Sequence, residues 1–363
     1  MKKLAAFLLA ALMAVSTAAC SSGETSSSEA SNPEASSAAE SSAEASSGET
    51  FKITMVTDTG GVNDQSFNQL SWEGLQKLKE DVPGVEVSYA ESKQESDYAT
   101  NLDKAADDGN KLIWGVGFAM ADAIQNAATQ NPDISYAIVD NAYAEVPSNV
   151  TCVVFRAQEP SFLVGYIAGK TTETNKVGFV GGVKSDVIDQ FEYGYKAGVA
   201  YAANELGKDI EVVSQYAESF NDSAKGKAIA TSMFSGGCDI VFHAAGNVGV
   251  GVIEAAKEAD KFAIGVDKDQ AFLAPDNVLT SALKRVDVAV EQVSKDLIDG
   301  KEIGGKTYSF GLTEDGVGIP EDHSLMADET YDAAIELEQK IIDKEIVPPA
   351  SEDDYNAFVS SLE

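Results

Sequence analysis

Residues 53–78 read ITMVTDTGGVNDQSFNQLSWEGLQKL, and the rest of the chain can be interpreted outward from them. The run ITMV is short and apolar, which predicts a buried parallel strand. Gly60 and Gly61 follow it and allow the backbone to turn sharply. From Phe67 onward, apolar residues recur at helical spacing. These residues therefore predict a strand, a polar turn and a helix.

The polar turn is a candidate ligand site, because turns at the carboxyl ends of strands hold ligands in open α/β sheets. An ordinary loop with a capped helix is the alternative, since Asp, Asn and Ser all cap helices. The density of polar and aromatic side chains within this one turn favours a site. The candidates are Asp58, Asn63, Asp64, Phe67 and Asn68.

Strand-like and helix-like segments alternate through most of the chain, which is typical of βαβ units with parallel sheets. Predicted strands fall at 52–57, 85–90, 111–116, 136–139 and 151–155, and then at 177–181, 210–216, 240–244 and 262–266. Predicted helices fall near 68–81, 97–107 and 119–131, and then near 188–206, 223–235 and 249–258. The pattern predicts an α/β fold with two similar halves, although no residue-level repeat links them.

The remaining segments predict that the chain crosses between the halves several times. A helix at 161–171 opens the second half, a strand at 279–283 returns, a helix at 286–299 packs on the first half, and a helix at 329–344 closes the second. The expected lobes are 51–157 with 284–315, and 158–283 with 316–358. Multiple crossings form a hinge, which permits closure around a ligand.

The amino terminus resembles a bacterial lipoprotein signal. Two lysines precede an apolar run at 4–15, and small residues then lead to Cys20, which predicts a secretory signal at 1–19. Cys20 stands where a lipobox has its lipidated cysteine, although Thr17 replaces the usual Leu or Val. A plain signal peptide with a chance cysteine is the alternative. Residues 20–50 contain no basic residue and little apolar surface, so they predict a flexible tether.

Composition limits the partners. The net charge of −33 argues against nucleic acid and anionic membrane surfaces, so membrane contact is expected only through the N-terminal lipid. Three cysteines do not make a disulfide framework, and the two histidines lack the spacing of a metal site. We therefore expect a monomer without cofactor or metal, anchored by lipid to the extracytoplasmic face of the cell membrane.

Other strand ends supply further ligand candidates in both halves. Aromatic rings can sandwich a planar base or a sugar, ionised Asp accepts hydrogen bonds from hydroxyl or ring N–H groups, and Lys donates them. Core packing of each Phe and helix capping by each Asp are the alternatives, and capping explains Asp222 and Asp269 better. The candidates are Phe118 in the loop 115–120, Asp140, Phe220, Gly246, Asp267 and, on the returning strand, Lys284.

Arginine is scarce, which bears on the charge of the ligand. The chain has only Arg156 and Arg285, and both lie at predicted crossings. Arginine is the usual bidentate partner of phosphate and carboxylate groups, so neutral, hydroxyl-rich ligands are favoured. The glycines of 246–251 open a predicted helix, but they lack the spacing of a phosphate-binding loop.

The sequence TDTGGVNDQSFNQLSWEG closely resembles the opening of the basic membrane protein family of lipoproteins, and the resemblance covers residues 51–345. These are substrate-binding proteins of ABC importers and include a purine nucleoside receptor of spirochaetes. The resemblance implies a type I periplasmic-binding fold, in which two doubly wound parallel-sheet lobes are joined by a multi-strand hinge. It also implies an ABC permease as partner and ligand contacts from Asp58, Phe67, Asp140, Phe220, Gly246, Asp267 and Lys284.

The sequence is compatible with three functions. The first is a lipid-anchored binding protein that delivers a nucleoside, expected to be a purine nucleoside, to an ABC permease. The second is a binding protein or sensor for a sugar or another small metabolite. The third is an extracellular nucleoside hydrolase, which the aspartates at the first strand end allow. No G-x-S-x-G motif, zinc motif or nucleophile–base pair supports an enzyme, so we predict a binding protein without catalytic activity.

Overall fold

The computed structural model describes residues 50–362. The predicted signal at 1–19, Cys20 and nearly all of the predicted tether lie outside the described residues. Within 50–362, none of the helices has both the length and the apolar character needed to span a bilayer.

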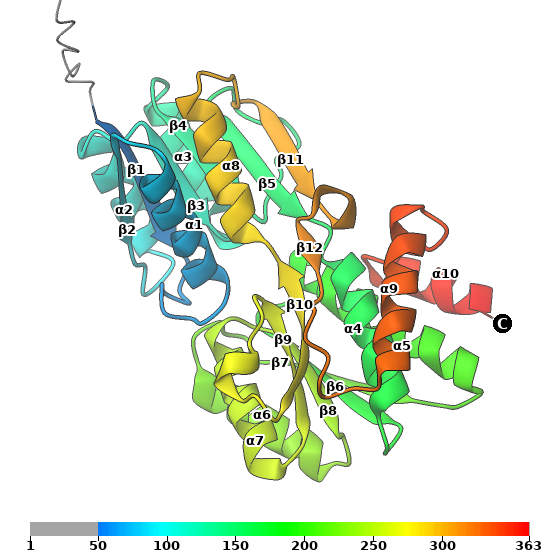
Figure 1. The fold of residues 1–363 in the computed structure, drawn as a ribbon. Helices are drawn as coiled ribbons and strands as arrows, with labels where there is room; N and C mark the ends of the chain where they lie inside the picture. Colours follow the sequence, from blue (N-terminus) through cyan, green and yellow to red (C-terminus); the bar gives the residue numbers. More distant parts are fainter. Residues whose placement is uncertain (1–49, 363) are drawn as a thin grey trace, which may run out of the picture. The chain divides into compact units, whose positions relative to one another are not determined.

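The first lobe is built on a six-stranded parallel sheet with the order β11-β5-β4-β3-β1-β2. Helices α1 and α8 cover one face of it, and α2 and α3 cover the other (Figure 1). The strands are β1 (Phe51–Thr57), β2 (Val85–Ala90), β3 (Leu112–Val116), β4 (Ser135–Val139), β5 (Val150–Phe155) and β11 (Lys306–Phe310). The helices are α1 (Phe67–Asp81), α2 (Asp97–Asp107), α3 (Ala121–Gln130) and α8 (Val286–Ile298).

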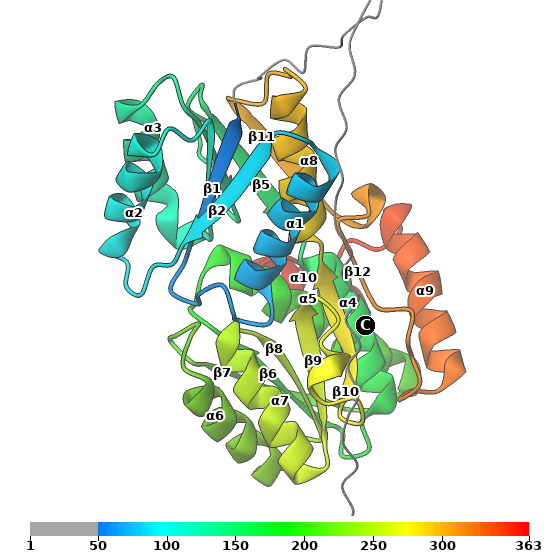
Figure 2. The same ribbon diagram turned by 60° about the vertical axis from the view of Figure 1, so that its left-hand side comes forward.

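The second lobe repeats this order as β12-β10-β9-β8-β6-β7, with only β12 antiparallel among the described strands. Helices α6 and α7 pack together on one face, and α4, α5, α9 and α10 on the other (Figure 2). The strands are β6 (Lys176–Gly181), β7 (Glu211–Tyr216), β8 (Ile240–Ala244), β9 (Phe262–Asp267), β10 (Val278–Lys284) and β12 (Val317–Gly318). The helices are α4 (Gln158–Thr171), α5 (Asp186–Leu206), α6 (Ser223–Ser235), α7 (Asn247–Ala259), α9 (Asp328–Ile342) and α10 (Glu352–Leu362).

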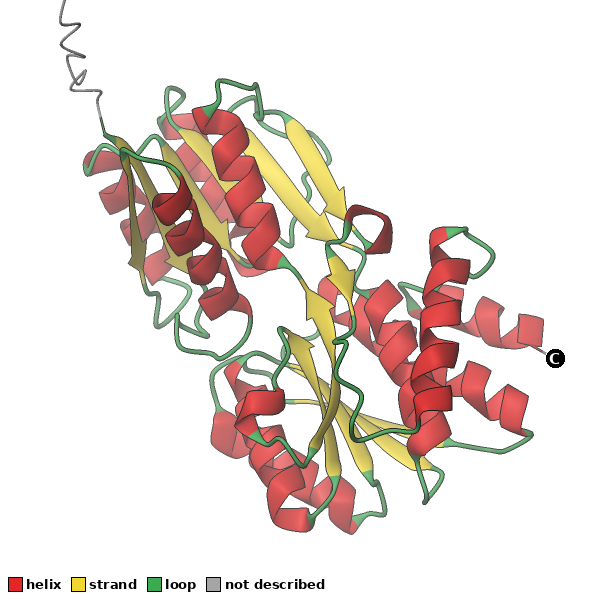
Figure 3. Ribbon diagram, in the orientation of Figure 1, coloured by secondary structure: helices red, strands yellow, loops and turns green. Residues whose placement is uncertain are grey.

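Three segments join the lobes: β5 to α4, β10 to α8, and β11 to β12 (Figure 3). Backbone hydrogen bonds of 2.8 Å tie these segments together, from Arg156 N to Phe310 O and from Arg285 N to Gly316 O. The two doubly wound parallel-sheet lobes and their multi-strand hinge are therefore confirmed.

The sequence pattern located most elements within three residues of their observed ends. The reason is burial: strand β1, for example, has its last five residues buried on both faces of the sheet. Three elements were not predicted, namely β11, β12 and α10. Strand β11 lies at a sheet edge and has only Phe310 buried, β12 has two residues, and α10 has no buried residue.

Candidate functional site

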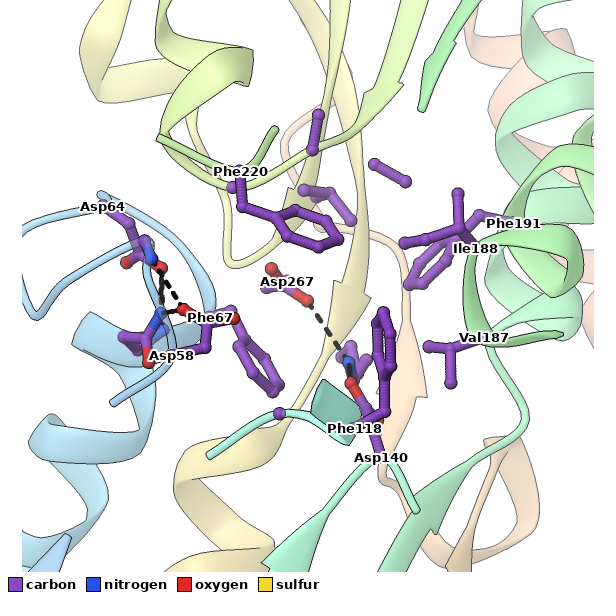
Figure 4. Close-up of a pocket in the computed structure, with 18 residues that line it drawn as sticks. Asp58, Asp64, Phe67, Phe118, Asp140, Val187, Ile188, Phe191, Phe220 and Asp267 are labelled. Carbon is purple, nitrogen blue, oxygen red and sulfur yellow. Dashed lines mark hydrogen bonds and ion pairs between the residues drawn. The ribbon is translucent and has the colours of Figure 1, made fainter. Parts of the chain in front are cut away.

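A partly open cavity lies between the lobes, at the carboxyl ends of the strands of both sheets (Figure 4). The empty space among its lining side chains is about 520 Å³ when the open mouth is included. The lining residues are Asp58, Gly60, Asp64, Phe67, Asn68, Gly117, Phe118, Asp140, Val187, Ile188, Phe191, Phe220, Ala244, Ala245, Gly246, Val266, Asp267 and Lys284.

The turn after β1 is organised by the buried carboxylate of Asp64. It accepts hydrogen bonds from the backbone N–H groups of Ser66, Asn68 and Gln69 at 2.9–3.0 Å, and so satisfies the free donors at the start of α1. The Asn68 side-chain Nδ2 donates to Asp64 at 3.0 Å and to Asp58 Oδ1 at 2.8 Å. Asn68 thereby fixes the Asp58 carboxylate at the edge of the cavity.

Two aspartates occupy matching positions in the lobes. Asp140 directly follows β4, and Asp267 is the last residue of β9. In the two strand orders given above, β4 and β9 are each the third strand of their sheet. Both aspartates have left-handed backbones, with φ of 64° and 66°, a conformation that Asp tolerates better than most residues. Figure 4 shows the carboxyl groups of Asp140 and Asp267 in the space between the lobes.

Lys284 joins these two aspartates. Its Nζ atom lies 2.5 Å from Asp140 Oδ2 and 3.9 Å from Asp267 Oδ1, and the side chain is buried. The same ammonium lies 4.4 Å from the centre of the Phe67 ring and 5.7 Å from that of Phe191. Among the lining residues, all from 50–362, Lys284 is the only basic one. The cavity wall therefore carries more negative than positive charge.

Aromatic rings from both lobes converge on the cavity (Figure 4). The rings of Phe118 and Phe220 meet edge to face across it, with centroids 6.2 Å apart. Gly182 makes room for the Phe220 ring, because a Cβ atom there would lie 2.1 Å from that ring. A flat, partly apolar ligand with polar edges fits walls made of rings and carboxylates.

Desolvation shifts the carboxyl groups of the site. It raises the pKa of Asp58 and of Asp267 to about 6, and it raises the pKa of Asp64. Hydrogen bonding by Asn68 opposes the shift at Asp58, and the positive charge of Lys284 opposes it at Asp267. Asp58 keeps some solvent contact whereas Asp267 is 5% exposed, so Asp267 gives the firmer basis for a prediction.

We expect Asp267→Asn to become more stable, relative to the parent, as the pH rises from 4 to 7. The folded parent keeps this proton up to pH about 6, whereas the ordinary pKa of 3.8 applies when unfolded. The carboxyl group therefore stabilises the folded state fully below pH 4 and loses that contribution as the pH passes 6. The amide of Asp267→Asn has no proton to lose. The free energy of unfolding of the variant should therefore rise relative to that of the parent by roughly 1–3 kcal/mol across this pH range.

Thermal unfolding of the ligand-free parent and variant across pH 4–8 measures this difference. Carboxyl groups that do not interact with Asp267 act equally in both proteins, so the difference between the two melting temperatures reports on this part of the site. A constant difference in melting temperature across the range would contradict the raised pKa of Asp267.

The structure brings together all but one of the predicted ligand residues. Asp58, Phe67, Asn68, Phe118, Asp140, Phe220, Gly246, Asp267 and Lys284 all line the cavity. Asn63 does not: it is exposed, whereas the side chain of its neighbour Asp64 is buried and accepts from the N–H groups at the start of α1. Asp222 caps α6 through Lys225 N, as predicted. Asp269 accepts a hydrogen bond from Ala271 N, but the N-cap residue of the short 3-10 helix Ala271–Leu273 is Gln270, so the predicted capping role of Asp269 is wrong.

Several lining residues were not predicted. Gly117 belongs to the predicted loop 115–120 but was not singled out; its φ of 121° brings the backbone close to Asp58. Val187, Ile188 and Phe191 lie in the first turns of α5, where apolar residues at helical spacing indicate core packing. No sequence signal marked them as cavity residues.

The two histidines have structural environments. His243 is buried beside Gly249, its Nε2 lies 3.0 Å from Gln270 Oε1, and burial lowers its pKa to about 4. His323 stacks on Tyr331 with ring centroids 4.1 Å apart. Within 50–362, no group of three or more His, Cys, Asp or Glu side chains is placed to hold a metal ion.

A cleft lined from two hinged α/β lobes defines a ligand-binding protein of the periplasmic-binding class. The family model described as "ABC transporter substrate-binding protein PnrA-like" matches residues 51–352. The chain belongs to this family, whose members are substrate-binding proteins of ABC transporters rather than enzymes.

Individual relatives agree. The chain is 40% identical to basic membrane protein A of Borreliella burgdorferi, with 86% of this chain and 91% of that protein covered. It is 41% identical to a CD4+ T-cell-stimulating antigen of Listeria monocytogenes, covering 82% and 88%. Among solved structures, an ABC transporter solute-binding protein from Aeropyrum pernix K1 is 31% identical with a TM-score of 0.78, covering 86% of this chain and 97% of that one. The likeness supports the type I periplasmic-binding fold.

Proposed function

We propose that the protein binds a purine nucleoside between its lobes and delivers it to an ABC permease on the extracytoplasmic side of the membrane. The observation that carries this proposal is the composition of the cavity wall, which combines rings from both lobes with four aspartates and one buried lysine that pairs with two of them. Rings stack on a planar base, and carboxylates accept hydrogen bonds from ring N–H and ribose hydroxyl groups.

The charge of the wall favours an uncharged nucleoside over a nucleotide. Asp58, Asp140 and Asp267 outnumber Lys284, and no arginine lines the cavity among the described residues. A phosphate group would meet carboxylates at close range without the bidentate donors that usually bind it. We therefore expect nucleosides to bind and their phosphates to be rejected.

A ligand screen tests the proposal directly. A ligand that binds only the folded state raises the melting temperature, so nucleosides, free bases, nucleotides and sugars can be compared in one series. We expect purine nucleosides to give the largest shifts. Shifts for ribose or glucose with none for any nucleoside would favour a sugar-binding function. Release of ribose from inosine beyond one turnover would instead show a nucleoside hydrolase.

The proposal includes a lipid anchor at Cys20. A substrate-binding protein must stay near its permease, and a lipid attached to Cys20, at the start of the segment 20–50, would keep it there. We expect Cys20→Ser to appear unprocessed or in the medium, whereas Cys152→Ser, which changes a buried thiol, should fractionate with membranes like the parent. Full membrane retention of Cys20→Ser would exclude the anchor.

A further inference from the structure

The lobes also touch one another directly beside the cavity, through residues that mostly do not line it. The first lobe contributes the turn before α1 and one residue of that helix, and the second lobe contributes the last residue of β9 and the loop after it. We call these contacts the clasp, and its members are Gln65, Ser66 and Glu73 of the first lobe and Asp267, Lys268 and Gln270 of the second.

Ser66 links the first lobe to a ligand candidate of the second. Its hydroxyl group donates to the Asp267 carboxylate and lies 3.4 Å from the carbonyl oxygen of Val266. Both Ser66 and Asp267 are buried. A hydrogen bond to a buried carboxylate is among the stronger kinds, and this one runs directly from one lobe to the other.

Gln270 is held so that its amide must face the first lobe. Its Oε1 accepts from Val266 N and lies 3.0 Å from His243 Nε2, while its backbone N–H donates to Ser281 Oγ. The Nε2 atom of Gln270 is therefore left to point away from the second lobe, and it donates to the carbonyl oxygen of Gln65 at 3.0 Å.

The backbone of both partners is shaped for this contact. Gln65 has φ of 57°, a left-handed conformation that a glutamine rarely adopts. A Cβ atom at residue 265, which is glycine, would lie 2.9 Å from the Gln270 amide oxygen. Strain and close approach of this kind persist where surrounding contacts require them.

An ion pair completes the clasp at the rim. Lys268 Nζ lies 2.9 and 3.0 Å from the two carboxylate oxygens of Glu73, and these side chains are 22% and 39% exposed. Neither residue lines the cavity. This pair can therefore hold the lobes together without touching a ligand.

We propose that the clasp sets how long the closed protein retains its ligand, and that Ser66 is a positioning residue for Asp267. The inference rests on the proposed function, because it needs a ligand in the cavity. Apparent affinity depends on the fraction of protein in the binding-competent state, so contacts that favour closure raise affinity and slow release.

Dissociation of a purine nucleoside from the full chain, followed by stopped flow, tests the ion pair. We expect Glu73→Gln and Lys268→Met each to speed release roughly two- to fivefold, as for a partly exposed pair, and the double variant to add little. The matched control is Lys77→Met with Asp81→Asn, an ion pair within α1 that touches only the first lobe. This control should leave the dissociation rate unchanged, and the association rate should be the same in the parent and in all of these variants.

Ser66→Ala tests the buried contact. We expect about tenfold faster release and a larger average distance between spin labels on α2 and α6 in the ligand-free protein. Ser161→Ala is the control, because Ser161 is also buried but its hydroxyl group donates within α4, to Ala157 O at 2.7 Å. A role in stability alone would change melting temperature without changing either readout.

The two proposals fail in different ways. If the parent binds no nucleoside, the proposed function falls, and the label distances still test the clasp without ligand. If the parent binds a nucleoside but Ser66→Ala and the Glu73/Lys268 variants match it in release rate and label distance, the clasp is refuted while the function stands.

Discussion

Replacing Lys284 with methionine is expected to lower the free energy of unfolding by about 3–5 kcal/mol, the usual cost of removing one partner from a buried ion pair. Lys284 is 2% exposed and lies between Asp140 and Asp267, at 2.5 and 3.9 Å. Methionine fills a similar volume but leaves both carboxylates without their cation. Ligand binding should be lost as well, because the unpaired carboxylates repel one another where the lobes close.

Urea unfolding of the variant measures the loss, and two further proteins separate its causes. Lys301→Met removes a lysine that is paired with Asp296 at the surface, and it should cost no more than about 1 kcal/mol. Adding Asp140→Asn to Lys284→Met removes one stranded charge and should restore part of the stability. An unfolding midpoint of Lys284→Met equal to that of the parent would show that the pair is solvated in solution.

The repeated strand order explains why one lysine can serve both lobes. Each lobe presents a residue with positive φ shortly after its third strand and another at the end of its fourth: Gly117 and Asp140 in the first, Gly246 and Asp267 in the second. No continuous sequence repeat revealed this, because the match is confined to single residues at strand ends. Lys284 ends β10, which leads directly into the first lobe, so its ammonium reaches the aspartates of both.

Much of the fold was predictable because it depends on burial. Continuous apolar runs such as that of β1 have no stable place except inside a covered parallel sheet. Edge elements do not obey this constraint. Strand β11 is mostly exposed and α10 packs by partly buried rings such as Tyr355, so neither carries a strong apolar pattern.

The site was predictable where residue type and strand end coincide, as for Asp58 and Asp267. It was not predictable where several residues could do the same task. Asn63, Asp64 and Ser66 are all able to cap a helix, and their propensities barely differ. Only the path of the turn decides that Asp64 is buried under α1 while Asn63 faces solvent.

Two variants are expected to separate the recognition of the base from the recognition of the ribose. Phe67→Ala should weaken nucleosides and free bases alike by about 1–3 kcal/mol, since a ring that stacks on the base serves both. Asp267→Asn should weaken nucleosides by about 2–3 kcal/mol and spare free bases, if its carboxylate accepts from ribose hydroxyl groups. Asparagine suits this test better than alanine because residue 267 has φ of 66°, which asparagine tolerates.

Calorimetry with guanosine, inosine, adenosine, their free bases and ribose measures both losses. The amide oxygen introduced by Asp267→Asn can still accept from Ser66, so the clasp is retained and the loss reports on the ligand contact. Asp269→Asn is the matched control, because Asp269 lies two residues after Asp267 and outside the cavity, and this variant should bind like the parent. If Asp267→Asn lowers the affinity for free bases and for nucleosides equally, Asp267 does not contact the ribose, which must then bind elsewhere in the cavity. Parent-like affinity for every nucleoside in both variants would remove Phe67 and Asp267 from the ligand site, although the fold would stand.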